Sequence, residues 1–169
     1  MEIIKKIGKV GSILAKVGSI LAGDDKRRER NEKFLLACKE RRIDEVKSLL
    51  EKGADINAKN AEGDTALIIA SSKNGAHLPS DEDSFNLVCL LLRYGSEGRV
   101  RINVNERDNK GNTALIKASR NGAARIVDKL IDAGADINAK NSKEYTALMR
   151  AEEHGYSETV RILREHGAR

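Results

Sequence analysis

The strongest constraint on the fold is an identical octapeptide that occurs twice. Gly-Ala-Asp-Ile-Asn-Ala-Lys-Asn stands at 53–60 and again at 134–141, 81 residues later. A second marker, Thr-Ala-Leu, begins at Thr65, Thr113 and Thr146, so its steps of 48 and 33 residues together also span 81. One unit therefore has 33 residues and another carries 15 more. Such a period predicts a stack of similar units, each of which buries its apolar face against its neighbours.

The spacing of apolar residues predicts an amphipathic helix in every unit. Val127, Leu130 and Ile131 lie at positions i, i+3 and i+4, and the same pattern recurs at 46–50, 88–92 and 160–163. Each helix is expected to end at a glycine, since glycine readily adopts the left-handed conformation that closes a helix. These are Gly53, Gly95, Gly134 and Gly167. The three threonines of the Thr-Ala-Leu marker are predicted to cap the first helix of their units.

The unit at 111–138 is the most complete. It begins Gly-Asn-Thr-Ala-Leu at 111–115, continues with Ala118 and Gly122 and two apolar pairs at 126–127 and 130–131, and ends Gly-Ala-Asp-Ile-Asn at 134–138. This pattern closely resembles the ankyrin repeat, and the resemblance extends over about residues 30–169. The Thr-Pro-Leu-His of that family is here Thr-Ala-Leu-Ile or Thr-Ala-Leu-Met, without the proline and the histidine.

The resemblance implies an all-α ankyrin-repeat solenoid of about four helix-turn-helix units, joined by short β-hairpin-like loops. We expect an amphipathic N-terminal helix, outside the resemblance, to precede it. We place a charged linker or helix extension at 24–33 and the repeat domain at 34–169. Its units are expected at about 34–60, 61–108, 109–141 and 142–169. The additional residues are expected to form loops near 75–84 and 96–101, either as neutral variation in length or as contacts with a partner.

Residues 1–23 lie outside the repeat and have a pattern of their own. The heptapeptide Lys-Val-Gly-Ser-Ile-Leu-Ala occurs at 9–15 and again at 16–22. Apolar residues recur there at the spacing of one helical face, at Ile3, Ile7, Val10, Leu14, Val17 and Leu21. Interior glycines each destabilise a helix by about 1 kcal/mol relative to alanine, so this helix needs a surface to bind. Three surfaces remain open: the first repeat unit, an anionic membrane and a second helix.

The composition argues against catalysis. Aromatic residues make up 3% of the chain, and its two cysteines and three histidines are not spaced as metal ligands. No nucleophile-elbow, phosphate-loop or zinc-protease motif occurs. We therefore expect a protein that is not an enzyme and has no cofactor and no metal. The cysteine usage indicates a cytoplasmic location, with peripheral membrane attachment and a secreted effector as alternatives.

What remains is recognition. Residues 1–33 carry nine basic and five acidic side chains, so most of the net charge of +5 lies there, and a nucleic-acid partner is not indicated. The ankyrin resemblance implies that a partner protein binds along the concave face, through loop tips and the ends of the first helices. The candidate residues are Lys73, Arg107, Asn109, Lys110, Asn112, Arg120, Asn121, Lys140, Lys143 and Tyr145.

All six charged candidates are basic, which favours an acidic partner surface. Tyr145 is the aromatic residue among them and the expected anchor. Glu144 stands where the family has glycine, so the turn there is expected to be distorted. Two alternatives remain: a membrane-associated adaptor or effector directed to anionic lipid by residues 1–23, and a homo-oligomer formed by the same residues.

Overall fold

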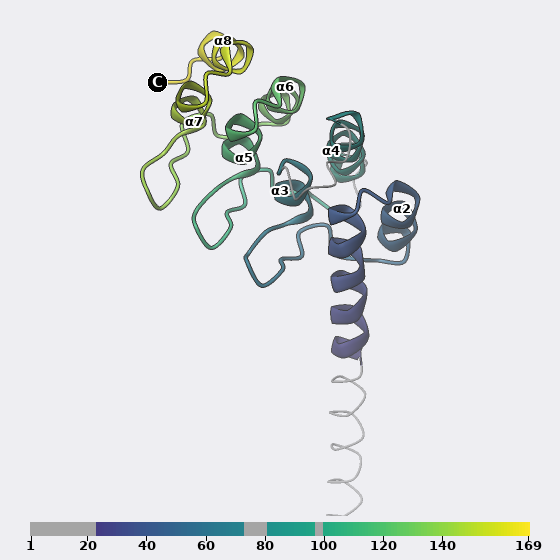
Figure 1. Ribbon diagram of the computed structural model, residues 1–169. Coiled ribbons are helices and arrows are strands. Elements are labelled where there is room, and N and C mark those ends of the chain that lie inside the picture. The colour runs from purple at the N-terminus through teal and green to yellow at the C-terminus, as the bar shows by residue number, and fades with distance from the viewer. Residues whose placement is uncertain (1–22, 73–80, 97–99) are drawn as a thin grey trace, which may run out of the picture.

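The computed structural model describes residues 23–72, 81–96 and 100–169, which form a stack of helix pairs (Figure 1). A helix at 23–39 pairs with α2 (Ile43–Glu51). Three further pairs follow along the chain: α3 (Ala66–Ala70) with α4 (Asp81–Ser96), α5 (Ala114–Arg120) with α6 (Ala124–Asp132), and α7 (Ala147–Glu153) with α8 (Ser157–Glu165). The predicted all-α repeat solenoid is confirmed.

Equivalent helices of successive pairs lie side by side. In the inner row α5 packs against both α3 and α7, and in the outer row α6 packs against both α4 and α8. The loops that lead into the inner helices all project to the same side (Figure 1). We call them the first loop (54–64), the second loop (102–112) and the third loop (135–145). Loops and inner helices therefore present one continuous surface.

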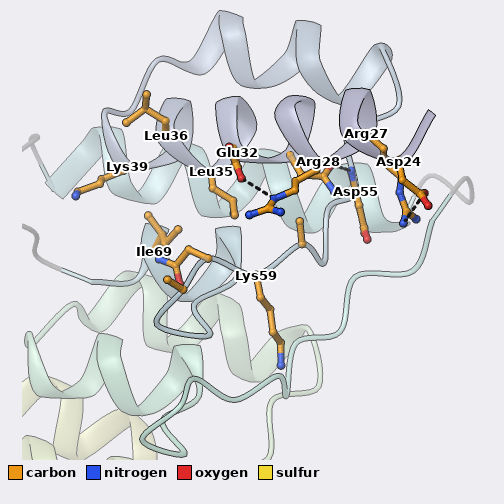
Figure 2. A pocket seen from close by; sticks show the side chains of 14 residues that line it. Asp24, Arg27, Arg28, Glu32, Leu35, Leu36, Lys39, Asp55, Lys59 and Ile69 are labelled. Atoms are coloured by element: carbon orange, nitrogen blue, oxygen red, sulfur yellow. Dashed lines mark hydrogen bonds and ion pairs between the residues drawn. The ribbon is translucent and has the colours of Figure 1, made fainter. Parts of the chain in front are cut away.

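The helix at 23–39 is longer than the inner helices and extends past the first loop (Figure 1). Its first two turns are exposed and carry ion pairs between side chains one turn apart. Arg28 Nε donates to Glu32 at 3.1 Å (Figure 2), and Lys33 Nζ donates to Glu29 at 2.6 Å. Each such pair stabilises a helix by about 0.2–0.5 kcal/mol.

Arg30 and Asn31 tie this helix to the first loop in the way that the loops are tied to each other. Asn105 of the second loop donates to the carbonyl of Gly134, directly before the third loop, at 3.2 Å and accepts from the N–H of Asp136 at 2.7 Å. At the first loop, Arg30 donates to the carbonyl of Gly53 at 3.0 Å, and Asn31 accepts from the N–H of Asp55 at 2.9 Å. The helix thus takes the place of a preceding loop.

The three marker threonines cap the inner helices, as predicted. Thr65, Thr113 and Thr146 each have an extended backbone and accept a hydrogen bond from the N–H three residues later, at 3.4, 3.3 and 3.2 Å. Each hydroxyl satisfies a backbone donor that has no partner within the helix. Loss of such a cap costs about 1 kcal/mol. The Thr-Ala-Leu marker therefore encodes where each inner helix begins.

The prediction that a glycine follows the end of each outer helix is confirmed at three of four positions. Gly53, Gly134 and Gly167 follow α2, α6 and α8 with φ of 82°, 87° and 86°. The prediction is wrong at Gly95, which lies inside α4, since that helix continues to Ser96. A Cβ atom at Gly95 would lie 2.6 Å from Cγ2 of Ile102. This glycine therefore permits a close approach of the second loop to α4.

The expected loop at 75–84 is wrong for its last four residues. Positions 81–84 belong to α4, which has 16 residues where α2, α6 and α8 have nine each. Part of the additional sequence therefore lengthens a helix. The rest of this segment lies outside the described residues, as do positions 97–99 of the second expected insertion.

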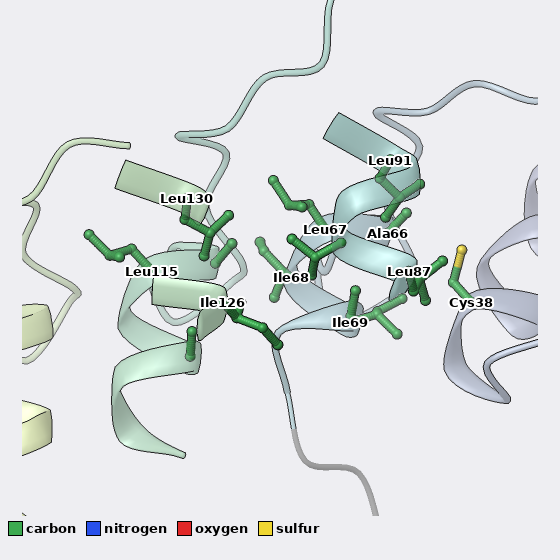
Figure 3. Close-up of a cluster of buried hydrophobic side chains, with 14 of the residues drawn as sticks. Cys38, Ala66, Leu67, Ile68, Ile69, Leu87, Leu91, Leu115, Ile126 and Leu130 are labelled. Carbon is green, nitrogen blue, oxygen red and sulfur yellow. The ribbon is translucent and has the colours of Figure 1, made fainter. Parts of the chain in front are cut away.

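Aliphatic side chains from both rows form one core (Figure 3). Leu67 and Ile68 of α3 meet Leu87 and Leu91 of α4, and all four are at most 1% exposed. Cys38 is part of this core, and burial raises the pKa of its thiol to about 12. A thiol that stays protonated is a poor nucleophile, so Cys38 acts as a small apolar residue.

Candidate protein-binding surface

Each loop is closed by one side chain. Asn60, Asp108 and Asn141 accept hydrogen bonds through Oδ1 from the N–H groups two and four residues later, at 2.8–3.1 Å. The same three residues also donate their own N–H to the carbonyl four residues later, at 3.0–3.1 Å. These bonds give the three loops the same local shape. The loop tips are therefore fixed before any partner arrives.

The expected distortion at Glu144 is wrong. Its φ of 63° is close to the 77° of Gly63 and the 74° of Gly111, and its N–H bonds back to the closing residue as theirs do. A Cβ atom at either of these glycines would lie 2.8 Å from a backbone nitrogen of the following loop. Glu144 is in the third loop and its side chain is 78% exposed. A side chain is tolerated there because no described loop packs against it.

Neighbouring loops are also bonded to each other. Asn109 donates from its backbone and its Nδ2 atom to two carbonyls of the first loop, at 3.0 and 2.9 Å. Arg107 donates to the carbonyl of Lys140 at 2.6 Å, and Ser142 donates its N–H to the carbonyl of Lys110 at 3.0 Å. These contacts align the loop tips in a row and fix the spacing of the side chains on them.

A buried ion pair supports the second loop. Lys117 Nζ lies 3.0 Å from Asp108 and 3.8 Å from Asp64. Burial alone would raise the pKa of Asp108, but hydrogen bonds from Asn112 and Lys117 hold it below its ordinary value. The pKa of Asp64 is raised, chiefly by burial. The pKa values of the two carboxylates therefore shift in opposite directions, because hydrogen bonds outweigh burial at Asp108 and burial dominates at Asp64.

A groove of about 400 Å³ lies between the second and third loops, over α5 and α7. Five of its ten lining residues are basic and none is acidic. Two of the five have carboxylate partners: Lys117, as above, and Arg150, which lies 2.6 Å from Glu153. The other three have no carboxylate within 4.0 Å among the described residues. We call this groove the cation groove, and Lys110, Arg120 and Lys143 are its unpaired cations.

Tyr145 lies beside this groove but is already engaged. The guanidinium carbon of Arg150 stands 3.7 Å from the centre of its ring, a cation–π contact, and the tyrosine is half-buried. This contact covers one face of the ring and fixes both side chains. A partner would therefore meet the rest of Tyr145 as part of a rigid wall.

The other predicted contact residues fall into two groups. Asn112 bonds within and between loops, Asn121 donates to the carbonyl of Ser71 at 3.0 Å, and Lys140 pairs with Glu144 at 3.0 Å. These side chains hold the surface together. Lys73 lies outside the described residues, and so do Ile3, Ile7, Val10, Leu14, Val17 and Leu21, so the predictions of membrane binding or helix pairing stay predictions.

Lys117 and Arg150 are not among the predicted contact residues. Both stand four residues after a marker threonine, where α3 has the buried Ile69. An apolar residue in one unit replaced by a cation in two others is a signal that an alignment of the units could have revealed. This replacement distinguishes α5 and α7, which carry a cation at this position, from α3, which does not.

The described residues contain no group of three or more histidine, cysteine, aspartate or glutamate side chains that could hold a metal ion. None of the helices in the described ranges is both long and apolar enough to span a bilayer.

Comparison with known proteins agrees with the architecture. A family model for ankyrin repeats in three copies matches residues 34–141 and, in a second match, 76–169. The putative ankyrin repeat protein FPV031 of Fowlpox virus is 38% identical over 115 residues, which are 66% of this chain and 29% of that protein.

Two Notch proteins are also similar. Neurogenic locus notch homolog protein 2 of Homo sapiens is 34% identical over 91 residues, 50% of this chain, and the Neurogenic locus Notch protein of Drosophila melanogaster is 33% identical over 128 residues, 76% of this chain. The match covers 4% of each Notch protein, so this chain spans only a small part of its relatives.

Proposed function

The chain belongs to the ankyrin repeat family, and on that premise we propose that it is a non-enzymatic module that binds an acidic segment of a partner protein in its cation groove. Ankyrin repeats are generally protein–protein interaction modules. The proposal adds the place on this chain and the chemistry of the partner.

The observation that carries the proposal is the difference between paired and unpaired cations in one groove. Lys117 and Arg150 neutralise carboxylates of the chain itself and support the loop and the helix they belong to. Lys110, Arg120 and Lys143 form no ion pair within 4.0 Å among the described residues, and all three are exposed. The charge of Arg120 does act at longer range on Glu153 and helps to lower its pKa. The backbone at these positions is fixed by the bonded loops and by α5, so only the side chains have to be ordered when they bind carboxylates.

The electrostatics favour a protein partner with clustered carboxylates. Three positive charges around a groove of about 400 Å³ attract an acidic segment and suppress binding of basic ones. Because the charges are exposed, added salt is expected to weaken the interaction strongly. This sensitivity to salt distinguishes binding by charge from binding driven by the burial of apolar surface.

The test is a charge reversal with a matched control. The variant Lys110→Glu/Arg120→Glu/Lys143→Glu removes the groove's positive charge, whereas Lys47→Glu/Lys52→Glu/Lys129→Glu makes the same change in net charge on the outer side, in and beside α2 and α6. Binding of a fluorescein-labelled octaglutamate peptide is measured by anisotropy at low and high salt.

We expect the natural chain and the control variant to bind the peptide at low salt, and the groove variant to lose at least tenfold in affinity. If both variants lose affinity equally, net charge alone drives binding and the proposal is wrong. If the natural chain does not bind the peptide at all, the groove is not a carboxylate site.

A further inference from the structure

A second groove lies at the other end of the same surface. It has a volume of about 910 Å³ and runs between the helix at 23–39 and the first loop, with Ile69 of α3 at its floor (Figure 2). On the helix its lining extends from Asp24 to Lys39, which is about 22 Å of helix length. This is long enough for several residues of an extended polypeptide. We call it the helix–loop groove.

One end of the helix–loop groove is polar, and its cations are paired. Arg27 lies 3.4 Å from Asp24, and Arg28 lies 3.1 Å from Glu32 (Figure 2). These four side chains line the groove and are charge-balanced. Asp55 of the first loop also lines this end, so it has one carboxylate more than it has cations and does not attract an acidic ligand.

The other end is apolar and unfilled. Leu35, Leu36 and Ile69 line it together with two alanines of the first loop. Leu36 is 47% exposed, whereas positions 34, 35, 37 and 38 are at most 6% exposed. Lys39 stands at the same end, and its side chain has no ion pair or hydrogen bond within the described ranges. An exposed leucine beside an unpaired lysine fits an apolar side chain that is accompanied by a carboxylate.

We propose that the helix–loop groove takes a large apolar side chain of the same acidic segment that the cation groove binds. The proposal rests on the proposed function, because the acidic part of the segment is placed in the cation groove. The partner class is then an acidic segment with one apolar anchor, and Leu36 is the residue that contacts this anchor.

The two grooves belong to one surface at a defined separation. The helix–loop groove lies between the helix at 23–39 and α3, and the cation groove lies between α5 and α7. Two helix-to-helix steps separate them, or about 16–20 Å. An extended chain advances about 3.3 Å per residue, so the anchor should stand about six residues from the carboxylates.

Charge complementarity selects this occupant over the chain's own N-terminal segment. Residues 1–22 carry four lysines and one glutamate. Lys59 is neutralised by Glu106 at 2.6 Å, whereas Lys39 has no ion pair among the described residues. A lysine-rich segment at the apolar end would therefore place like charges beside Lys39. An acidic segment meets no such repulsion at the apolar end of the groove.

The experiment uses synthetic fluorescein-labelled peptides on the full chain. Each has four consecutive glutamates in a Gly/Ser background, with one leucine placed three, six or nine residues from them on either side. The reference peptide has serine in place of the leucine. The protein variants are Leu36→Ser and, as a matched control, Met149→Ser, because Met149 is 48% exposed and lines neither groove.

We expect leucine at a distance of six to increase affinity at least fivefold over the serine peptide on one side of the glutamates. Leu36→Ser should abolish this gain without changing the affinity of the serine peptide, and Met149→Ser should leave both unchanged. If leucine gives no gain at any distance, or if the gain survives in Leu36→Ser, the inference is overturned while the proposed function stands. If the serine peptide itself does not bind, the proposed function fails and the inference fails with it.

Discussion

The turn after the inner helix is built differently in the first pair and in the last two. Gly122 and Gly155 follow α5 and α7 with φ of 68° and 71°, as expected for a position that favours glycine. Arg41 follows the helix at 23–39 with φ of 58°, although it has a side chain. This conformation costs a residue other than glycine about 1–2 kcal/mol. Other interactions in the first helix pair must therefore offset a cost that the last two pairs do not have.

The offsetting interactions are hydrogen bonds from a buried guanidinium. Arg41 Nη2 donates to the carbonyls of Ile69 and Ser72 at 3.1 and 3.0 Å, and Nη1 donates to that of Cys38 at 2.7 Å. The nitrogen Nε donates to Ser84 Oγ of α4 at 3.3 Å. One side chain thus closes the ends of two helices and reaches a third. The comparison teaches that the first pair departs from the repeat at Arg41 because it makes contacts there that the last two pairs lack.

The largest effect is expected from breaking this contact. Arg41→Gly relieves the backbone conformation but leaves several carbonyls at helix ends without a donor, so we expect the free energy of unfolding to fall by about 2–4 kcal/mol. Urea denaturation measures it. Arg42→Ala is the control, since Arg42 makes only exposed ion pairs with Glu40 and Glu45 and should change stability by at most about 1 kcal/mol. Equal stability of Arg41→Gly and the natural chain would show that the bonds only offset the backbone strain at this position and add no net stability.

The second loop departs from the others by closing on a carboxylate. Asp108 receives hydrogen bonds from Asn112 and an ion pair from Lys117. In Asp108→Asn an amide nitrogen would face these two donors, so we expect a loss of about 1–2 kcal/mol at neutral pH. A double-mutant cycle with Lys117→Met should give a coupling of at least about 0.5 kcal/mol. If the two substitutions change the free energy of unfolding additively, the ion pair between Asp108 and Lys117 does not support the loop.

A smaller effect is expected from acid. The pKa of Asp108 is lowered in the folded chain, so its contribution is present above the pKa of an unfolded aspartate, about 3.9, and is lost as the pH falls through the lowered value. The pKa of Asp64 is raised, so protonation of Asp64 relieves part of the cost of its burial. In urea titrations from pH 7 to 2.5, Asp108→Asn should flatten the acid loss of stability and Asp64→Asn should steepen it. The same change in both variants would contradict the two assignments.

The repeated features were predictable because they recur at fixed spacing. The threonine caps and three helix-ending glycines follow from residue types that local backbone geometry demands, whatever surrounds them. Gly95 was misassigned because its reason is a neighbour distant in sequence, Ile102, and not the local turn. The helical start of α4 was missed since the composition of 75–84 is that of a loop.

The candidate site was predictable in its charge and less so in its details. Lys110, Arg120 and Lys143 were named from their positions in the repeat, and all three line one groove. The asparagines named with them bond to neighbouring loops or to the end of α3, because an amide side chain satisfies other polar groups of the chain as readily as a ligand. Leu36 could not be recognised, because its exposure depends on where the helix at 23–39 lies against the first loop.

The smallest effect is expected at Glu144, where the third loop departs from the first two. Glu144→Gly removes the strain of a left-handed glutamate but increases the entropy of the unfolded chain, and it loses an exposed ion pair with Lys140. We expect a net stabilisation of about 0.5–1 kcal/mol. Glu144→Ala keeps the strain and loses the same ion pair, so it should be no more stable than the natural chain. If Glu144→Ala is instead more stable than Glu144→Gly, the side chain and not the backbone conformation controls the stability of this turn.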